Sequence, residues 1–312
     1  MESIVKVVGL SHHYTTQWAV RDVNFEISSH GVVGLLGSNG AGKSTTMNII
    51  CGVLNQTEGD IFIKDINLRE NPVEAKKHVG FLPQRPPVYG DLNVEEYLTY
   101  CAELRLMAKE QIPTAVEEAM KRCGILHFRR RLIRNLSGGY QQRVGIAQAI
   151  VHKPEFVVLD EPTNGLDPNQ IVEIRELIKE IATDRAVLLS THILSEVQAT
   201  CQQIIMIEHG NIVFKGSIAE FDNYIEPNSF MVELATPPAK EELGKIDGIS
   251  QVEQLSPTRF RLTFDKKKET MKKFVSKAVS SGWGLSECVL QKVSLDEIFA
   301  ELSGKREKGV QR

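Results

Sequence analysis

The stretch GLLGSNGAGKSTTMNII, residues 34–50, limits the possible folds of this chain more than any other feature. It matches the pattern G-x-x-x-x-G-K-[ST] at Gly37, Gly42, Lys43 and Ser44. The apolar run VVGLL within and before it is typical of a buried parallel strand, and STTMNIICG is typical of a helix that a glycine ends. A strand, a glycine loop and a helix in this order predict an α/β protein with a parallel sheet.

The backbone of this loop suits phosphate groups. Its glycines let successive N–H groups point inward, and the N-terminus of the following helix adds partial positive charge. On this motif, Lys43 would hold the β- and γ-phosphates of a nucleotide and Ser44 would bind Mg²⁺. The alternative is a chance glycine turn with an ion-paired lysine, and the flanking strand and helix disfavour it.

Composition limits the class of protein and its partners. A chain of 312 residues, 42% hydrophobic and 25% charged, is long enough for a larger and a smaller core and has the make-up of an ordinary globular protein. The formal net charge of -3 argues against a general nucleic-acid binder. No apolar run approaches the about 20 residues of a membrane-spanning helix. We therefore expect a cytoplasmic protein, with no nucleic-acid partner and with five reduced cysteines.

Periodicity predicts the elements around the loop. Residues 3–14 and 20–28 are expected strands, and residues 57–68 have the turn pattern of a small antiparallel hairpin. Apolar positions at helical spacing predict helices over 94–101 and from Pro113 to 123. A helical insert and an antiparallel β subdomain thus accompany the parallel sheet.

Two later apolar runs, VVLDE and LLSTH, end in polar residues. Ligands of open α/β sheets bind at the carboxyl ends of the strands, so these residues should face the phosphate loop. There Asp160 suits Mg²⁺, and Glu161 suits the orientation or deprotonation of an attacking water. His192 could stabilise charge that develops on a γ-phosphate. Each could instead be an ordinary polar strand end, but the upstream loop favours catalysis.

The last third of the chain predicts a second, smaller domain. After the first domain, residues 1–217, and a linker, residues 218–227, the order strand, helix, strand, strand, helix, strand over 228–303 is ferredoxin-like. Ser294 and a glutamate three residues on would form the capping box of a closing helix. Residues 304–312 are an expected polar tail.

Six motifs together resemble those of the ATP-binding cassette (ABC) ATPases. The segment LSGGYQQRV, residues 136–144, is similar to the signature of that family and lies between the helical insert and VVLDE. The resemblance also covers the phosphate loop, Gln84 in FLPQRP (the Q-loop), GLDP at 165–168 (the D-loop) and His192 (the H-loop). Tyr14 resembles the aromatic residue that stacks on adenine. The motifs appear in the family's order.

The resemblance implies a P-loop ATPase that hydrolyses ATP with Mg²⁺. The implied catalytic residues are Glu161, His192 and Gln84, and the implied metal ligands are Ser44, Gln84 and Asp160. The implied nucleotide-binding residues are Tyr14, Val20, Gly37, Ser38, Asn39, Gly40, Ala41, Gly42, Lys43, Ser44, Thr45, Ser137, Gly138, Gly139 and Asp167.

The signature also implies a dimer. Ser137, Gly138 and Gly139 precede a helix and form another hydroxyl-plus-amide anion site. In the family, two chains meet head to tail, and each ATP lies between the loop of one subunit and the signature of the other. Two residues depart from the family: Tyr140 replaces its most common glutamine and Ser38 a frequent proline. Neither change removes a group that contacts phosphate.

The C-terminal unit resembles, more weakly, the extension of ATP-binding subunits of bacterial exporters of the multidrug, polysaccharide and gliding-motility (GldA-like) type, notably in SLDEIFAEL. We therefore expect the ATPase subunit of an export-type ABC transporter, a homodimer bound at the inner face of the membrane to separate permease subunits. The surface around Gln84 and RPPVYGDLNVEEYL would meet the permease. Two alternatives remain open: a non-transport ABC ATPase of DNA repair, translation or cofactor assembly, and a nucleotide-gated module without turnover.

Overall fold

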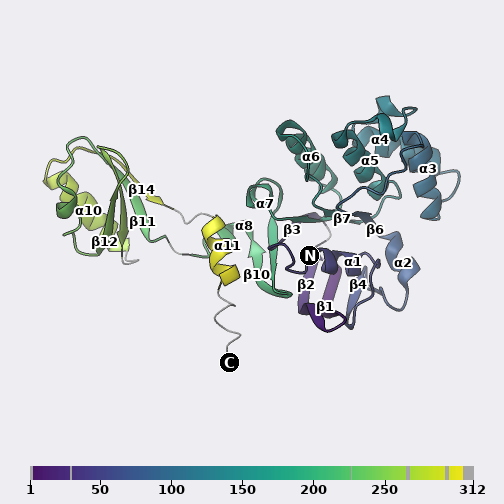
Figure 1. The fold of residues 1–312 in the computed structure, drawn as a ribbon, viewed down its shortest axis with the longest axis horizontal. Helices are drawn as coiled ribbons and strands as arrows, with labels where there is room; N and C mark the ends of the chain where they lie inside the picture. Colours follow the sequence, from purple (N-terminus) through teal and green to yellow (C-terminus); the bar gives the residue numbers. More distant parts are fainter. Residues whose placement is uncertain (1–2, 29, 226, 265–267, 292–294, 305–312) are drawn as a thin grey trace. The chain divides into compact units, whose positions relative to one another are not determined.

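The chain folds into two units. The computed structural model describes residues 3–28, 30–225, 227–264, 268–291 and 295–304. The units comprise residues 1–218 and 219–312. The first unit joins a mixed sheet, an antiparallel sheet and a helical layer (Figure 1). The α/β class predicted from the sequence is confirmed.

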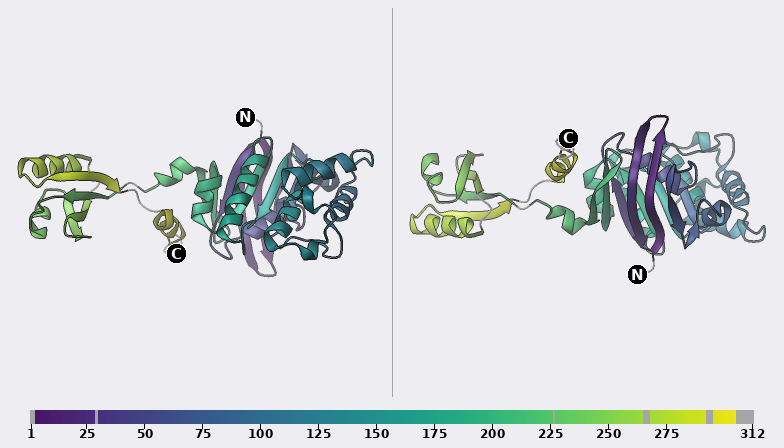
Figure 2. Two further views of the ribbon diagram at one scale, coloured as in Figure 1. Left: turned by 90° about the horizontal axis from the view of Figure 1, so that it is seen from above. Right: turned by 90° about the horizontal axis from the view of Figure 1, so that it is seen from below.

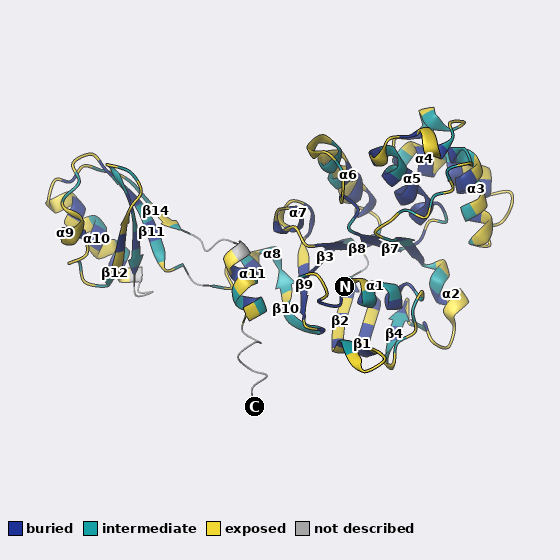
Figure 3. Cartoon of the chain, viewed as in Figure 1, coloured by how far each residue is buried: buried dark blue, intermediate teal, exposed yellow. Residues whose placement is uncertain are grey.

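A six-stranded sheet forms the centre of the first unit. Its order is β10-β9-β3-β8-β7-β6, and β10 alone runs antiparallel, at one edge. Strands β7 and β8 are buried along their whole length (Figure 3) because both faces of the sheet are covered, which is why their sequences are continuous apolar runs. The strands are β3 (Gly31–Leu36), β6 (Val79–Leu82), β7 (Phe156–Asp160), β8 (Ala186–Thr191), β9 (Gln203–Glu208) and β10 (Asn211–Ser217).

Helices cover both faces of this sheet. Helices α3 to α6 lie on one side, and α1 with the antiparallel sheet lies on the other (Figure 1). The predicted helices after Asn93 and at Pro113 are present. Asn93 forms a capping box with Glu96, and the second helix begins one residue earlier than predicted. The helices are α1 (Lys43–Ile50), α2 (Pro72–Lys77), α3 (Val94–Leu104), α4 (Ile112–Arg122), α5 (Gly138–Ile150), α6 (Pro168–Ile181) and α7 (Leu194–Thr200).

The antiparallel sheet has the order β2-β1-β4-β5. Its two long strands run side by side and are seen from below in Figure 2. The predicted hairpin is present, and β2 starts three residues before the predicted Val20 because its pairing with β1 continues to Gln17. Val23, Phe25 and Ile27 alternate into a core shared with α1. The strands are β1 (Ser3–Tyr14), β2 (Gln17–Ser28), β4 (Glu58–Ile63) and β5 (Ile66–Asn67).

The second unit has the predicted ferredoxin-like order. Its four antiparallel strands follow the order β12-β13-β11-β14 around a core that includes Phe230, Phe260, Phe274 and Trp283. The predicted closing helix is present, but its capping residue Ser294 lies outside the described residues. The elements from the linker onward are α8 (Ile218–Asp222), β11 (Ser229–Leu234), α9 (Lys240–Leu243), β12 (Ile249–Gln254), β13 (Arg259–Phe264), α10 (Lys268–Ser280), β14 (Leu285–Gln291) and α11 (Leu295–Gly304).

Within the described ranges, no helix combines the length and the apolar character that crossing a bilayer requires.

Candidate active site

The glycine loop lies between β3 and α1, at the carboxyl end of the central sheet. A Cβ atom at Gly37 would lie 2.2 Å from the carbonyl oxygen of Ile207 on the neighbouring strand β9. Gly42 has a φ of 109°, and a Cβ there would lie 2.7 Å from the carbonyl oxygen of Ala19. Only glycine fits either position, so the curl of the loop depends on its close packing against Ile207 and Ala19.

Lys43 is the first residue of α1, and its ammonium group lies inside the curl of the loop. Its Nζ donates hydrogen bonds to the carbonyl oxygens of Gly37, at 2.8 Å, and Ser38, at 2.9 Å. Burial lowers the pKa of Lys43 below its ordinary value, although the charges of Glu161, Asp160 and other carboxylates favour its protonated form. The partners of this buried ammonium are neutral carbonyls, and charged phosphate oxygens would make stronger hydrogen bonds with it. Lys43 can therefore bind phosphate oxygens in place of these carbonyls.

Asp160 ends strand β7 two strands away from the loop. It is 6% exposed, and burial raises its pKa above the ordinary value, whereas the nearby hydroxyls of Ser190 and Ser44 and the charge of Lys43 favour the charged form. Ser44 belongs to the first turn of α1, so this turn lies beside the end of the strand. The predicted pair of Mg²⁺ ligands, a hydroxyl and a carboxylate, is therefore side by side in the folded chain.

Glu161 follows Asp160 and is the centre of a polar cluster. Its Oε1 lies 2.9 Å from Nδ1 of His192, and its Oε2 accepts hydrogen bonds from the amide nitrogens of Gln84, at 2.8 Å, and Asn164, at 3.2 Å. Its φ is 47°, a left-handed conformation that is unusual outside glycine. Gln84 and His192 lie 77 and 31 positions from Glu161 along the chain. The three residues predicted to be catalytic therefore meet at the carboxylate of Glu161.

The oxygen atoms at this place suit Mg²⁺. Ser44 supplies a hydroxyl, Asp160 a carboxylate and Gln84 an amide carbonyl, and Mg²⁺ prefers such hard oxygen ligands with water and phosphate completing its shell. Because Gln84 uses its amide nitrogen toward Glu161, its oxygen is the atom suited to a metal. The residues fit the predicted metal.

The predicted signature lies in the helical layer. Ser137 and Gly138 are exposed at the N-terminus of α5, and Ser137 makes no side-chain capping bond there. Its hydroxyl and the free N–H groups of the helix can thus meet a partner. Helix α5 and helix α1 lie on opposite sides of the sheet (Figure 1), so the loop and the signature of one chain belong to separate layers. Tyr140 packs edge-on against Phe128, with ring centroids 4.6 Å apart.

The remaining predicted residues have different surroundings. Tyr14 is 50% exposed at the end of β1, and the ring of His12 packs edge-on to its ring with centroids 4.7 Å apart. Val20 is buried against the loop at Gly42. Asp167 is exposed and caps helix α6 by accepting a hydrogen bond from the backbone N–H of Gln170 at 3.0 Å. Asn39, Gly40, Ala41 and Thr45 lie in the loop and the first turn of α1.

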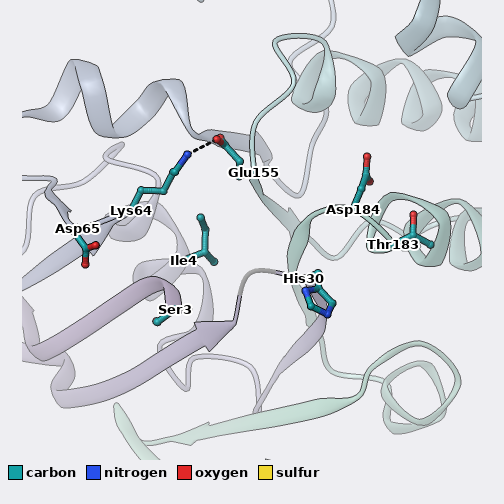
Figure 4. Close-up of a pocket in the computed structure, with 8 residues that line it drawn as sticks. All are labelled: Ser3, Ile4, His30, Lys64, Asp65, Glu155, Thr183 and Asp184. Atoms are coloured by element: carbon teal, nitrogen blue, oxygen red, sulfur yellow. Dashed lines mark hydrogen bonds and ion pairs between the residues drawn. The ribbon is translucent and has the colours of Figure 1, made fainter. Parts of the chain in front are cut away.

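The cavity drawn in Figure 4 is a separate feature. It measures about 480 Å³, and Lys64 and Glu155 form an ion pair of 2.6 Å beside it. His30, Glu155 and Asp184 precede strands β3, β7 and β8, so this cavity lies at the amino ends of the strands. None of the residues labelled there is a predicted site residue.

Sequence reasoning missed three contributors to the site. Asn164 joins the cluster at Glu161, Glu208 binds Ser38 in the loop, and Glu196 binds two threonines beside the cluster. Glu208 ends the apolar run IIMIE and could have been found by the same strand-end pattern that marked Asp160. Glu196 lies within a short helix and carries no such signal.

Comparison with known proteins finds similarity to ATP-binding proteins of ABC transporters. A family model described as ABC transporter matches residues 20–164, and a model of an AAA domain matches residues 132–197. The chain is 34% identical over 238 residues to the bacitracin transport ATP-binding protein BcrA of Bacillus licheniformis, covering 75% of each chain. It is 32% identical over 215 residues to the lipopolysaccharide export system ATP-binding protein LptB of Escherichia coli, covering 68% of this chain and 89% of that one.

A solved structure shares the fold of the first unit. It is a dimeric, post-hydrolysis state of the ATP-binding cassette MJ0796 with bound ADP and phosphate. The TM-score is 0.62 at 26% sequence identity, over 69% of this chain and 98% of the solved one.

Proposed function

This chain belongs to the ABC transporter family as an ATP-binding subunit, and from that premise we propose that it is the ATPase that powers an exporter. The cluster of Gln84, Glu161 and His192 beside the phosphate loop is the observation that carries the proposal. A phosphate loop without catalytic side chains would be enough for a module that binds a nucleotide and does not hydrolyse it. A carboxylate held between a histidine and a glutamine suits a protein that hydrolyses ATP.

Binding of ATP would use the loop and the exposed aromatic ring. The N–H groups of the loop, other than that of Ser38, and the ammonium of Lys43 would hold the phosphates, and Tyr14 would stack on the adenine. Ser44, Asp160 and Gln84 would hold Mg²⁺, which would neutralise charge between the β- and γ-phosphates. The bonds of Lys43 to Gly37 and Ser38 support this role, because they keep the ammonium within the loop before the nucleotide arrives.

Hydrolysis would begin at the carboxylate of Glu161. This group would take a proton from a water as the water oxygen attacks the γ-phosphorus, and the bond from that phosphorus to the ADP oxygen would break. His192 would donate a hydrogen bond to the γ-phosphate as its charge grows. The two hydrogen bonds that Glu161 accepts from amide nitrogens fix the direction of its lone pairs, which supports its assignment as the base.

Two copies of the chain would form the working enzyme. The exposed Ser137 and the N-terminus of α5 would close over the γ-phosphate of an ATP held by the other copy, and Asp167 would lie near the same interface. The dimeric state of the related cassette supports this arrangement. ATP would then join the two subunits, and hydrolysis would release them.

The chain would act at the cytoplasmic face of a membrane, bound to separate permease subunits. The two relatives are named for bacitracin transport and lipopolysaccharide export; both names support a transporter, and the second supports an outward direction. The surface around Gln84 would carry the nucleotide state to the permease. The ferredoxin-like domain, residues 228–303, would be an accessory domain that follows the linker 218–227.

Affinity purification of the full chain from membranes tests the proposal. A tagged Glu161→Gln chain in ATP and Mg²⁺ should recover an integral membrane protein, which protein sequencing then identifies. Reconstituted with that partner, the wild-type chain should release phosphate and move cargo away from its own side of the membrane. Recovery of DNA or ribosomes instead would favour the non-transport alternative.

A further inference from the structure

Glu196 is a buried carboxylate close to the proposed catalytic cluster. It lies in helix α7 and is 2% exposed. Its Oε1 accepts a hydrogen bond from the hydroxyl of Thr163 at 2.7 Å, and its Oε2 accepts one from the hydroxyl of Thr191 at 2.8 Å. One side chain therefore joins two segments that come from different strands.

These two segments carry the two partners of the catalytic contact. Thr163 lies two residues after Glu161, and Thr191 immediately precedes His192. The hydroxyl of Thr191 also accepts the backbone N–H of Ile193 at 3.0 Å, so the chain is fixed on both sides of His192. The Glu161–His192 distance of 2.9 Å is thus set by two backbone segments that Glu196 holds together.

The charge of Glu196 also has a partner on the next helix. A guanidinium nitrogen of Arg175 lies 3.6 Å from its Oε1. Arg175 belongs to α6, the helix that begins at Pro168, the last residue of the GLDP segment. The carboxylate therefore connects the segment after Glu161, the segment before His192 and the helix of the D-loop. A buried carboxylate is costly without such partners, so the three contacts act as a unit.

We propose that Glu196 is a positioning residue for ATP hydrolysis. It does not touch the nucleotide; it fixes the separation and orientation of Glu161 and His192 through Thr163 and Thr191. This inference rests on the proposed function, because it assigns a role within the same reaction. A misplacement of about 1 Å between catalytic groups can lower a rate by about 100-fold. We therefore expect the hydrogen bonds of Glu196 with Thr163 and Thr191 to affect the rate of hydrolysis strongly and the affinity for ATP little.

Steady-state kinetics of the full chain test the role. Glu196→Ala removes both tethers, and kcat should fall about 10-fold or more while KM for ATP changes less than about threefold. Glu196→Gln keeps an oxygen for one threonine and an N–H for the other hydroxyl, so its kcat should stay within about threefold of wild type. Gln198→Ala, an exposed change on the same helix, is the matched control and should have no effect.

Thr163→Val and Thr191→Val test each tether where Glu196→Ala does not fold. Each keeps the shape of the side chain and loses one hydroxyl, and each should lower kcat with KM retained. An active wild type with an unchanged kcat in the folded alanine variant would overturn the positioning role alone. The positioning role would also be overturned if Glu196→Ala and Glu196→Gln lost kcat and thermal stability equally and both had a raised KM for ATP. A wild type without hydrolysis would overturn the proposed function as well.

Discussion

The carboxylate of Glu208 holds Ser38 of the phosphate loop through two hydrogen bonds, one from the backbone N–H and one from the hydroxyl, each 2.7 Å long. Glu208 is 1% exposed at the end of β9, 170 residues away in the sequence. Next to it, the N–H of Gly210 donates to the carbonyl of Ala41 at 3.0 Å. The end of β9 and the turn after it therefore support the loop from behind, and the N–H of Ser38 points away from the phosphate side.

The first prediction concerns this pair. Ser38→Pro removes both donors and leaves a buried carboxylate without them, so the free energy of unfolding should fall by about 1–3 kcal/mol. Ser38→Pro with Glu208→Leu should recover most of that loss, because neither partner is then polar. Urea unfolding of the wild type, both single variants and the double variant measures the coupling. Additive single effects would contradict a direct interaction, and Ser38→Ala, which keeps the N–H, should lose less.

The second prediction concerns Glu161. Glu161→Gln keeps the hydrogen-bonding shape of the cluster but loses the base, so phosphate release should slow by at least about 100-fold while ATP affinity is kept. The variant should accumulate as an ATP-bound dimer, detectable by light scattering after size exclusion. Glu176→Gln, on the exposed side of α6, is the control. Undiminished phosphate release in Glu161→Gln would show that another group is the base.

The third prediction concerns Lys43. Lys43→Ala removes an ammonium that would make charge-assisted hydrogen bonds with two phosphates, each contributing about 1.5–3 kcal/mol. ATP affinity should fall about 100-fold or more, as measured by titration with a fluorescent ATP analogue. Lys153→Ala, which breaks only a surface ion pair with Glu118, should bind normally. An unchanged affinity in Lys43→Ala would remove this lysine from the phosphate site.

The fourth prediction concerns pH and His152. Burial, with the positive charge of Arg105, lowers the pKa of His152 from 6.5 to about 3, and its Nε2 lies 3.0 Å from the carbonyl oxygen of Val79. As the pH falls, His152 is therefore protonated in the unfolded chain at a higher pH than in the folded chain. The stability that neutral His152 contributes is present above pH 6.5 and is lost as the pH falls from 6.5 toward 3, by up to about 1.4 kcal/mol per pH unit.

Urea unfolding between pH 4.5 and pH 7.5 measures this dependence. His152→Gln should lack the component, so its stability curve should be flatter with pH than that of the wild type. His209→Asn is the control, because His209 is exposed and asparagine tolerates its φ of 48°. Parallel curves for wild type and His152→Gln would show that His152 does not control acid stability.

The sequence could predict individual helices and strands because their ends and periodicity depend on residues close together in the chain. Gly52 and Gly124 have positive φ directly after or close to the ends of α1 and α4, where the sequence predicted that these helices end. The last strand of the order predicted over 228–303 is β14. The residue pattern of the glycine loop lies between one strand end and one helix start, so the sequence alone could predict the loop together with the strand-end positions of Asp160 and His192.

The tertiary structure decided which of these residues meet. The sheet order places β9, β3, β8 and β7 next to one another although the chain reaches them in another order, and apolar periodicity does not encode neighbours. The contacts of Ser38 with Glu208 and of Glu196 with Thr163 span 170 and 33 positions. Each depends on the packing of strands and helices that only the folded chain brings together, because a buried carboxylate is stable only where distant donors converge on it.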